Sequence, residues 1–215
     1  MFMKLFYGAD KLVIEPKFGL GNPKNDYGLG FYLTPDYPLA VLWASKNKEN
    51  GYAITYSLNM KNLKVLYLNN NSEEDVLKWI TILVNHRFSK DEYEENRQYI
   101  NWLRDHFYPN LSEYDVIVGY RADDAYFSYA KDFVSNNLSL ELLSEAMKLG
   151  KLGLQYVLIS KKAFSNIKYF SHKIIPPSKE YEIFRETTLN EYRRIKKEES
   201  INNTFIRDIM RKYNK

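Results

Sequence analysis

The stretch Tyr27–Thr34 reads YGLGFYLT, and it organises the interpretation of the whole chain. Its second part, Gly30–Thr34, combines aromatic residues with a β-branched one, which is typical of a β-strand. The residues before it, Pro16–Leu29, are rich in Gly, Pro and Asn and predict a loop. The residues after it, Leu39–Ser45, predict a short helix that carries Trp43 on one side.

Outward from this stretch, strands alternate with helical blocks. Short apolar or alternating runs predict strands at residues 4–7, 52–58, 63–68, 115–120, 155–160 and 167–170. Apolar positions at helical spacing predict helices at residues 73–88, 90–107, 125–134, 139–149 and 204–213. The first two helices begin with capping-box patterns at Ser72 and Ser89. This mixture of strands and helices predicts an α+β fold.

The composition sets limits on the chemistry. The chain has 215 residues, and 45% of them are hydrophobic, which is enough for a core in one domain with an appendage or in two small domains. It has no Cys, which excludes disulfides, thiolate zinc sites and a Cys nucleophile. The three His residues are scattered without metal-ligand spacing, so we expect no metal; they are His86, His106 and His172.

The chain offers no signal for a membrane. No apolar run reaches the roughly 18–20 residues that a membrane span needs. The first residues, MFMKLFYGADKL, lack the apolar core and cleavage site of a signal peptide. We therefore expect a cytoplasmic protein with no membrane partner.

Charge is concentrated at the C-terminal end. The formal net charge is +4, and residues 179–215 carry 10 Lys and Arg against 7 Asp and Glu. The body is therefore close to neutral, which argues against a structural nucleic-acid-binding protein. The composition changes after Pro176-Pro177, which predicts a body at residues 1–175 and a charged helical tail at 176–215. We interpret the tail as a segment that docks onto the body or, alternatively, binds a partner.

Three segments together resemble a known superfamily. They are LFYGA with Tyr7-Gly8, then YGLGFYLT followed by Ala40-x-x-Trp43-Ala44, and GYAITYSL at 51–58. Their order resembles the ADP-ribosyltransferase superfamily, in its diphtheria-toxin and poly(ADP-ribose) polymerase branch. It looks closest to uncharacterised bacterial toxin-like members with the pattern Y-H-G-S, D-[FY]-G-x-G-F-Y-x-T and A-x-x-W-A. The resemblance covers residues 3–68 well and 115–170 more weakly.

The resemblance implies a fold and a ligand. The fold would be a split β-sheet sandwich with a helical insert at about 72–110 and a C-terminal helical tail. The ligand would be NAD⁺, used as a substrate, with Tyr32 and Trp43 stacked on the two faces of the nicotinamide ring. Gly8 would offer its backbone N–H and C=O to the carboxamide. The other cofactor-binding positions that the resemblance implies are Tyr7, Gly30 and Thr34.

The implied catalytic residues are Gln155, Tyr32 and Tyr7. Tyr7 stands where the family usually has His, and Gln155 stands where its best-studied members have Glu. A neutral Gln keeps the hydrogen bond to the ribose but lacks the charge, and charge stabilisation in a dry site is usually a large catalytic term. Charged residues that could supply the missing charge are Asp26, Arg121, Asp123 and Asp124.

We therefore expect a mono-ADP-ribosyltransferase that moves ADP-ribose from NAD⁺ to a macromolecule and releases nicotinamide. The resemblance implies a bacterial toxin or defence effector, with a protein or nucleic-acid acceptor and an antitoxin as partners. Two alternatives stay open: a catalytically inactive NAD- or nucleotide-binding module and an NAD glycohydrolase. A purely structural interpretation also exists, in which Tyr32 and Trp43 are core aromatics and Gly28 and Gly30 only shape a turn.

Overall fold

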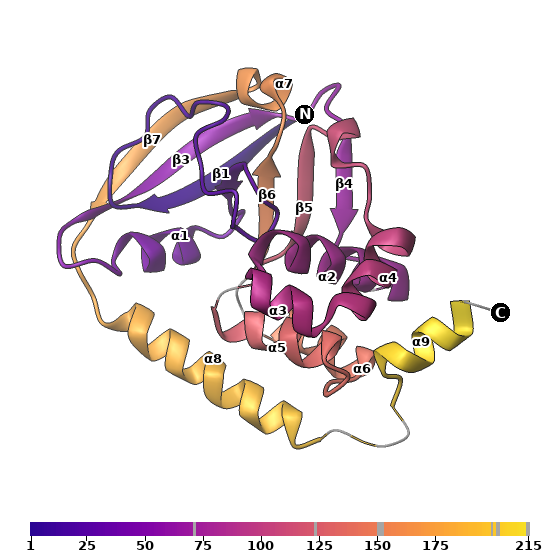
Figure 1. Ribbon diagram of the computed structural model, residues 1–215. Coiled ribbons are helices and arrows are strands. Elements are labelled where there is room, and N and C mark those ends of the chain that lie inside the picture. The colour runs from indigo at the N-terminus through magenta and orange to yellow at the C-terminus, as the bar shows by residue number, and fades with distance from the viewer. Residues whose placement is uncertain (71, 123, 150–152, 199, 201–202, 214–215) are drawn as a thin grey trace.

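The computed structural model describes residues 1–70, 72–122, 124–149, 153–198, 200 and 203–213 (Figure 1). It shows two β-sheets on one side of the molecule and a layer of helices on the other. The predicted α+β class is confirmed.

The first sheet contains three antiparallel strands in the order β1-β3-β7. They are β1 (Phe2–Ala9), β3 (Gly51–Asn59) and β7 (Ile167–Ile175). Residues 52–59 of the central strand β3 pair with β1, from Phe2 opposite Asn59 to Ala9 opposite Tyr52. Most of its side chains are buried, as expected for a strand with a neighbour on each edge.

The second sheet contains four strands in the order β2-β6-β5-β4. They are β2 (Phe31–Leu33), β6 (Leu154–Leu158), β5 (Val116–Tyr120) and β4 (Val65–Leu68). The pair β4–β5 is parallel and the other pairs are antiparallel. A parallel pair needs a long crossover, and the helices between these strands provide it.

One short bridge joins the two sheets. The N–H of Phe6 donates to the carbonyl of Thr34 at 2.8 Å, and the N–H of Thr34 donates back to the carbonyl of Phe6 at 2.9 Å. Beyond this bridge β1 pairs with β3 and β2 pairs with β6, so the two sheets separate. The candidate site lies where they part.

Helix α1 (Tyr37–Ala44) packs on β1 and β3. The side chain of Asp36 caps it by accepting from the N–H of Leu39 at 3.3 Å, and Pro38 occupies the first turn, where its missing N–H costs nothing. The helix therefore begins at a fixed position directly after β2.

The crossover contains α2 (Glu73–Arg87), α3 (Lys90–Glu95) and α4 (Arg97–Phe107), followed by the 3₁₀ turn η1 (Leu111–Glu113). Ser72 and Ser89 cap α2 and α3, as their sequence patterns predict. The prediction of a single helix over 90–107 was wrong, because the helix breaks at Asn96. The amide of Asn96 donates to the carbonyl of Glu92 at 3.1 Å, a local bond that competes with helix continuation.

The remaining helices are α5 (Asp124–Val134), α6 (Leu140–Leu149), α7 (Lys161–Ser165), α8 (Glu180–Lys196) and α9 (Ile206–Tyr213). Helix α7 was not expected from the sequence, and β7 extends five residues beyond the expected end at Phe170. In Figure 1, α8 runs along the bottom of the molecule and α9 lies beside α6.

The C-terminal tail is packed onto the body. Ile195, Ile206 and Ile209 are fully buried in the same core cluster as the side chains of α2, α4, α5 and α6. At the other end of α8, the N–H of Ser178 donates to the carbonyl of Ser45 at 3.0 Å, which fastens the start of the tail to the end of α1. The docking interpretation of the tail therefore agrees with the packing.

No helix in the described ranges combines the length and the apolar character needed to cross a bilayer.

Replacing Ile209 with Ala is expected to lower the free energy of unfolding by about 2–4 kcal/mol, because a fully buried branched side chain leaves a cavity. Urea denaturation measures the loss. The matched control is Ile183→Ala on α8, where the side chain is exposed and the change is expected to stay within about 0.5 kcal/mol. Equal effects of the two substitutions would show that α9 does not contribute to the core.

Candidate functional site

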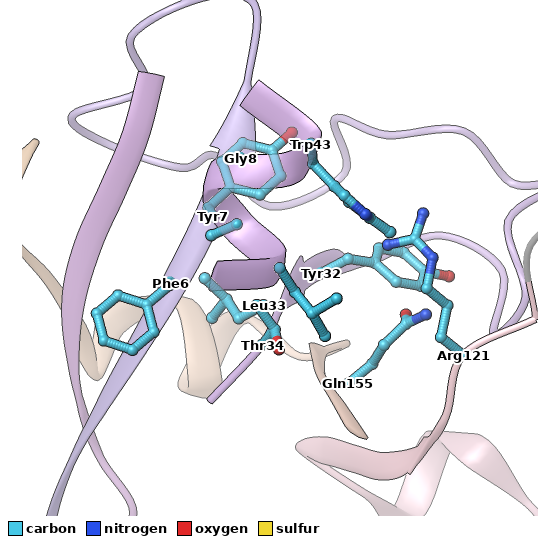
Figure 2. Close-up of a pocket in the computed structure, with 11 residues that line it drawn as sticks. Phe6, Tyr7, Gly8, Tyr32, Leu33, Thr34, Trp43, Arg121 and Gln155 are labelled. Carbon is cyan, nitrogen blue, oxygen red and sulfur yellow. The ribbon is translucent and has the colours of Figure 1, made fainter. Parts of the chain in front are cut away.

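A pocket opens at the split between β1 and β2, beneath α1 (Figure 2). It holds a cavity of about 50 Å³ and continues into a larger, more polar pocket of about 550 Å³. Five of the sequence-predicted site residues line both parts: Tyr7, Gly8, Tyr32, Trp43 and Gln155. Thr34 lines the inner part and Gly30 the outer part, so the fold brings all seven together.

Gly8 presents backbone atoms to this pocket. Phe6 bonds to Thr34 through both its N–H and its C=O, and residues of an antiparallel strand alternate between the two edges. Gly8, two residues further on, therefore directs its N–H and C=O away from β3 and toward the split. A Cβ at this position would lie 2.1 Å from the carbonyl oxygen of Ala40 and 2.8 Å from the Cβ of Trp43. Only glycine allows α1 to approach β1 this closely.

Tyr32 forms one wall and is held in place by the loop before β2. Its hydroxyl donates to the carbonyl of Gly28 at 2.6 Å and accepts from the N–H of Tyr27 at 3.1 Å. Burial, and then the charge of Asp26, raise the pKa of Tyr32 above its usual range. The phenol is therefore neutral and fixed, with its ring facing the pocket.

Trp43 forms the other wall from the last turn of α1. Its indole Nε1 is buried and has no hydrogen-bond partner among the described residues. The guanidinium of Arg121 lies on its ring, as a cation on the face of an aromatic system (Figure 2). This face of the indole is therefore occupied by a planar cation of the chain itself.

Tyr7 comes from β1 and packs against Phe31, with ring centroids 4.9 Å apart. Burial, and then the nearby Asp10, raise the pKa of Tyr7. The neutral phenol can therefore offer a hydrogen bond at the junction of the inner and outer pockets.

Gln155 lies at the floor of the pocket on β6 and is 4% exposed. Its Nε2 donates to Oδ2 of Asp26 at 3.4 Å. Its Oε1 is buried and has no hydrogen-bond partner within the described part of the chain. A buried acceptor without a donor costs free energy, so this oxygen has the capacity to accept one further hydrogen bond.

Asp26 is the buried charge of the site and is 7% exposed. Besides Gln155, it accepts from Nη1 of Arg87 at 2.9 Å and from the backbone N–H of Ala122 at 2.9 Å. Burial raises the pKa of Asp26, while Arg87 and then Arg121 act in the opposite direction. Of the other charges expected from the sequence, Asp123 and the side chain of Asp124 lie outside the described residues.

Gly30 and Thr34 also have structural roles. A Cβ on Gly30 would lie 2.6 Å from Cγ1 of Val157, so this glycine allows the start of β2 to approach β6. The hydroxyl of Thr34 accepts from the N–H of Asp36 at 3.1 Å, which fixes the turn into α1. Their places in the pocket do not by themselves assign them to a ligand.

The outer pocket includes residues that the sequence did not single out, namely Lys24, Lys46, Arg87 and Tyr181. Arg87 stands at the end of α2, and Tyr181 comes from α8. Each reaches the site through tertiary packing, so no local pattern marks it. The two lysines belong to polar loops that resemble any solvated surface.

A protein-family model matches residues 3–169 of the chain, and its description is "Protein of unknown function (DUF3990)". The chain belongs to the DUF3990 family. The region matched to DUF3990 contains every pocket residue except Tyr181, whereas α8 and α9 lie outside it. No curated protein and no solved structure matches the chain.

Replacing Arg87 with Met is expected to lower the free energy of unfolding by about 3–5 kcal/mol near neutral pH, because Asp26 loses its ion-pair partner while it stays buried. The pKa of Asp26 then rises further above its unfolded value. A group whose folded-state pKa is raised destabilises the fold above that pKa, and the penalty falls as the pH drops through it. Urea denaturation at several pH values checks this.

The control for this substitution is Arg97→Met, which removes an exposed guanidinium paired with Glu94 on the surface. Its effect is expected to stay within about 0.5 kcal/mol at every pH. A loss in Arg87→Met that does not shrink as the pH falls would contradict the assignment of the loss to the charge of Asp26.

Proposed function

We propose that this DUF3990 protein is an NAD⁺-dependent mono-ADP-ribosyltransferase built on an ADP-ribosyltransferase-like split sheet. One observation carries the proposal: Gly8, Tyr32, Trp43 and Gln155 come from separate elements and line one pocket at the split. A set of core aromatics and turn glycines would not need to meet around a cavity. The motif resemblance and this convergence are independent supports.

The inner pocket suits a nicotinamide ring. Tyr32 and Trp43 provide two aromatic faces, and the guanidinium of Arg121 already lies on the indole. A pyridinium is also a planar cation, so it would replace the guanidinium with another flat group of the same charge. The backbone N–H and C=O of Gly8 would bond the carboxamide, which carries one acceptor and two donors.

The outer pocket suits the rest of the dinucleotide. It is larger and more polar than the inner part, and Lys24 and Lys46 lie along it. Ammonium groups favour phosphate oxygens, so these side chains would attract the diphosphate. Tyr7, at the junction, would bond a ribose hydroxyl.

The reaction breaks the bond between the ribose carbon and the nicotinamide nitrogen. The electron pair of that bond goes to the pyridinium, which leaves as neutral nicotinamide, and positive charge develops on the ribose. The Oε1 of Gln155 would accept from a hydroxyl of that ribose and stabilise the charge. A nucleophile of the acceptor then bonds to the ribose carbon and loses its proton.

The acceptor in this proposal is a protein or a nucleic acid, and no metal takes part. The setting implied by the resemblance is a bacterial toxin or defence effector in the cytoplasm, held in check by an antitoxin. The motif resemblance alone supports this setting. The neutral Gln155 favours a second candidate, an NAD-binding module without catalysis.

The purified chain, incubated with labelled NAD⁺ and cell lysate, is expected to label a macromolecule and release nicotinamide. Trp43→Ala should weaken NAD⁺ binding about tenfold through lost stacking, and Gln155→Ala should retain binding while losing nicotinamide release. Tyr67→Ala, on β4 and outside both pockets, is the control. Free ADP-ribose without a labelled acceptor would indicate a glycohydrolase. Binding of NAD⁺ without nicotinamide release would indicate a binding module. The absence of both binding and release would reject the proposal.

Arg121→Ala should change binding at the inner and outer pockets in opposite directions. The indole loses its guanidinium, so binding of 1-methylnicotinamide, a small pyridinium cation, should strengthen about threefold. Binding of ADP-ribose should weaken, because a cation beside the polar pocket is lost. Titration of the tryptophan fluorescence measures both. If Arg121→Ala strengthens the binding of both probes, or weakens the binding of both, the placement of the pyridinium on Trp43 is contradicted.

A further inference from the structure

We infer that Asp26 supplies the negative charge that Gln155 lacks, so that the two residues act together: Gln155 touches the ribose, and Asp26 orients and polarises the Gln155 amide from behind. This inference rests on the proposed function. In this arrangement Gln155 is the catalytic residue and Asp26 is a positioning residue.

The first support is geometric. Asp26 lies in the loop before β2, whereas Gln155 lies on β6, and 129 positions of the chain separate them. The fold nevertheless brings Nε2 of Gln155 to within 3.4 Å of Oδ2 of Asp26. Both side chains are more than nine-tenths buried.

The second support is the direction of the Gln155 amide. Because the nitrogen donates to Asp26, the oxygen occupies the opposite branch of the same planar group. That oxygen has no hydrogen-bond partner among the described residues, although it is buried. Figure 2 shows the amide pointing up toward Tyr32 and Trp43. Asp26 thus holds an acceptor in the position that a ribose hydroxyl would need.

The third support is electrostatic. A carboxylate that accepts from an amide N–H draws negative charge toward the amide oxygen, and such polarisation is stronger in a dry site. Arg87 bonds the other carboxylate oxygen at 2.9 Å and favours the ionised form of Asp26, against the burial that raises its pKa. The negative charge of Asp26 therefore lies one hydrogen bond behind the Gln155 amide and does not touch the substrate.

This pairing also accounts for glutamine at position 155. A glutamate there would place a second carboxylate next to Asp26, at about the distance that now separates Nε2 from Oδ2. Two carboxylates that close cannot both ionise readily. A glutamate at 155 is therefore compatible with the site only when position 26 is neutral.

The test moves the carboxylate from position 26 to position 155 in the full-length chain and measures nicotinamide release from NAD⁺. Asp26→Asn is expected to lower kcat about 100-fold while KM changes less than about threefold. Gln155→Glu in the wild-type background is expected to lower kcat as well. Adding Gln155→Glu to Asp26→Asn is expected to raise kcat at least about tenfold over Asp26→Asn alone, because one carboxylate again faces the ribose.

The comparison within the Asp26→Asn background is the decisive one, because both variants share any loss of packing around position 26. Urea denaturation of each variant shows that it is folded. Asp105→Asn removes an exposed carboxylate on α4 and is the control that should leave kcat unchanged.

The outcomes separate the two proposals. A wild-type chain that releases no nicotinamide overturns the proposed function, and the inference about Asp26 falls with it. An active wild type in which Gln155→Glu lowers kcat in both backgrounds overturns only the role of Asp26. The reversal of sign between the backgrounds supports it, because a merely structural Asp26 predicts no such rescue.

Discussion

Two hydrogen bonds between Phe6 and Thr34 hold the two sheets together at one point, and the pocket depends on the fact that pairing stops there. Had β1 and β2 continued to pair, the N–H and C=O of Gly8 would be used within a sheet. Because the strands part, these groups face the pocket, and glycine lets α1 come close enough to place Trp43 beside them. A short contact followed by divergence thus creates both the cavity and its polar edge.

The charged groups around this cavity differ in how deeply they are buried. Asp26 is buried and bonded by Arg87, the Ala122 N–H and Gln155, whereas Lys24 and Lys46 line the more open outer pocket. A buried charge interacts over a longer range than an exposed one, because less water screens it. The arrangement therefore separates a dry electrostatic centre from a hydrated, cationic mouth. In the proposed reaction the positive charge develops on the ribose beside the dry centre, whereas the diphosphate lies in the hydrated mouth.

Local patterns predicted much of the fold. The strand at Gly30–Thr34, the short helix with Trp43 and the capped helix after Ser72 all occur close to their predicted bounds, because neighbouring residues determine them. The break at Asn96 depends on a side chain that bonds its own backbone, and periodicity does not register such a bond.

Contacts between distant residues explain the rest of the site. The residue types at Tyr7, Gly8, Tyr32, Trp43 and Gln155 pointed to one pocket through a resemblance, and their chemical roles remain predictions. The contacts of Asp26 with Arg87 and Gln155, and of Arg121 with Trp43, join elements far apart in the chain. Such contacts exist only after folding, so a single sequence carries no local signal for them.

The bond from Ser178 to Ser45 holds the start of the tail beside the outer pocket, where Tyr181 forms part of the lining. Tyr181 lies beyond residue 169, where the match to the family model ends, so part of the mouth is built from a segment outside the matched region. Because Tyr181 lines the outer pocket and not the inner one, a substitution at this rim would reshape the entrance while the inner lining keeps its residues.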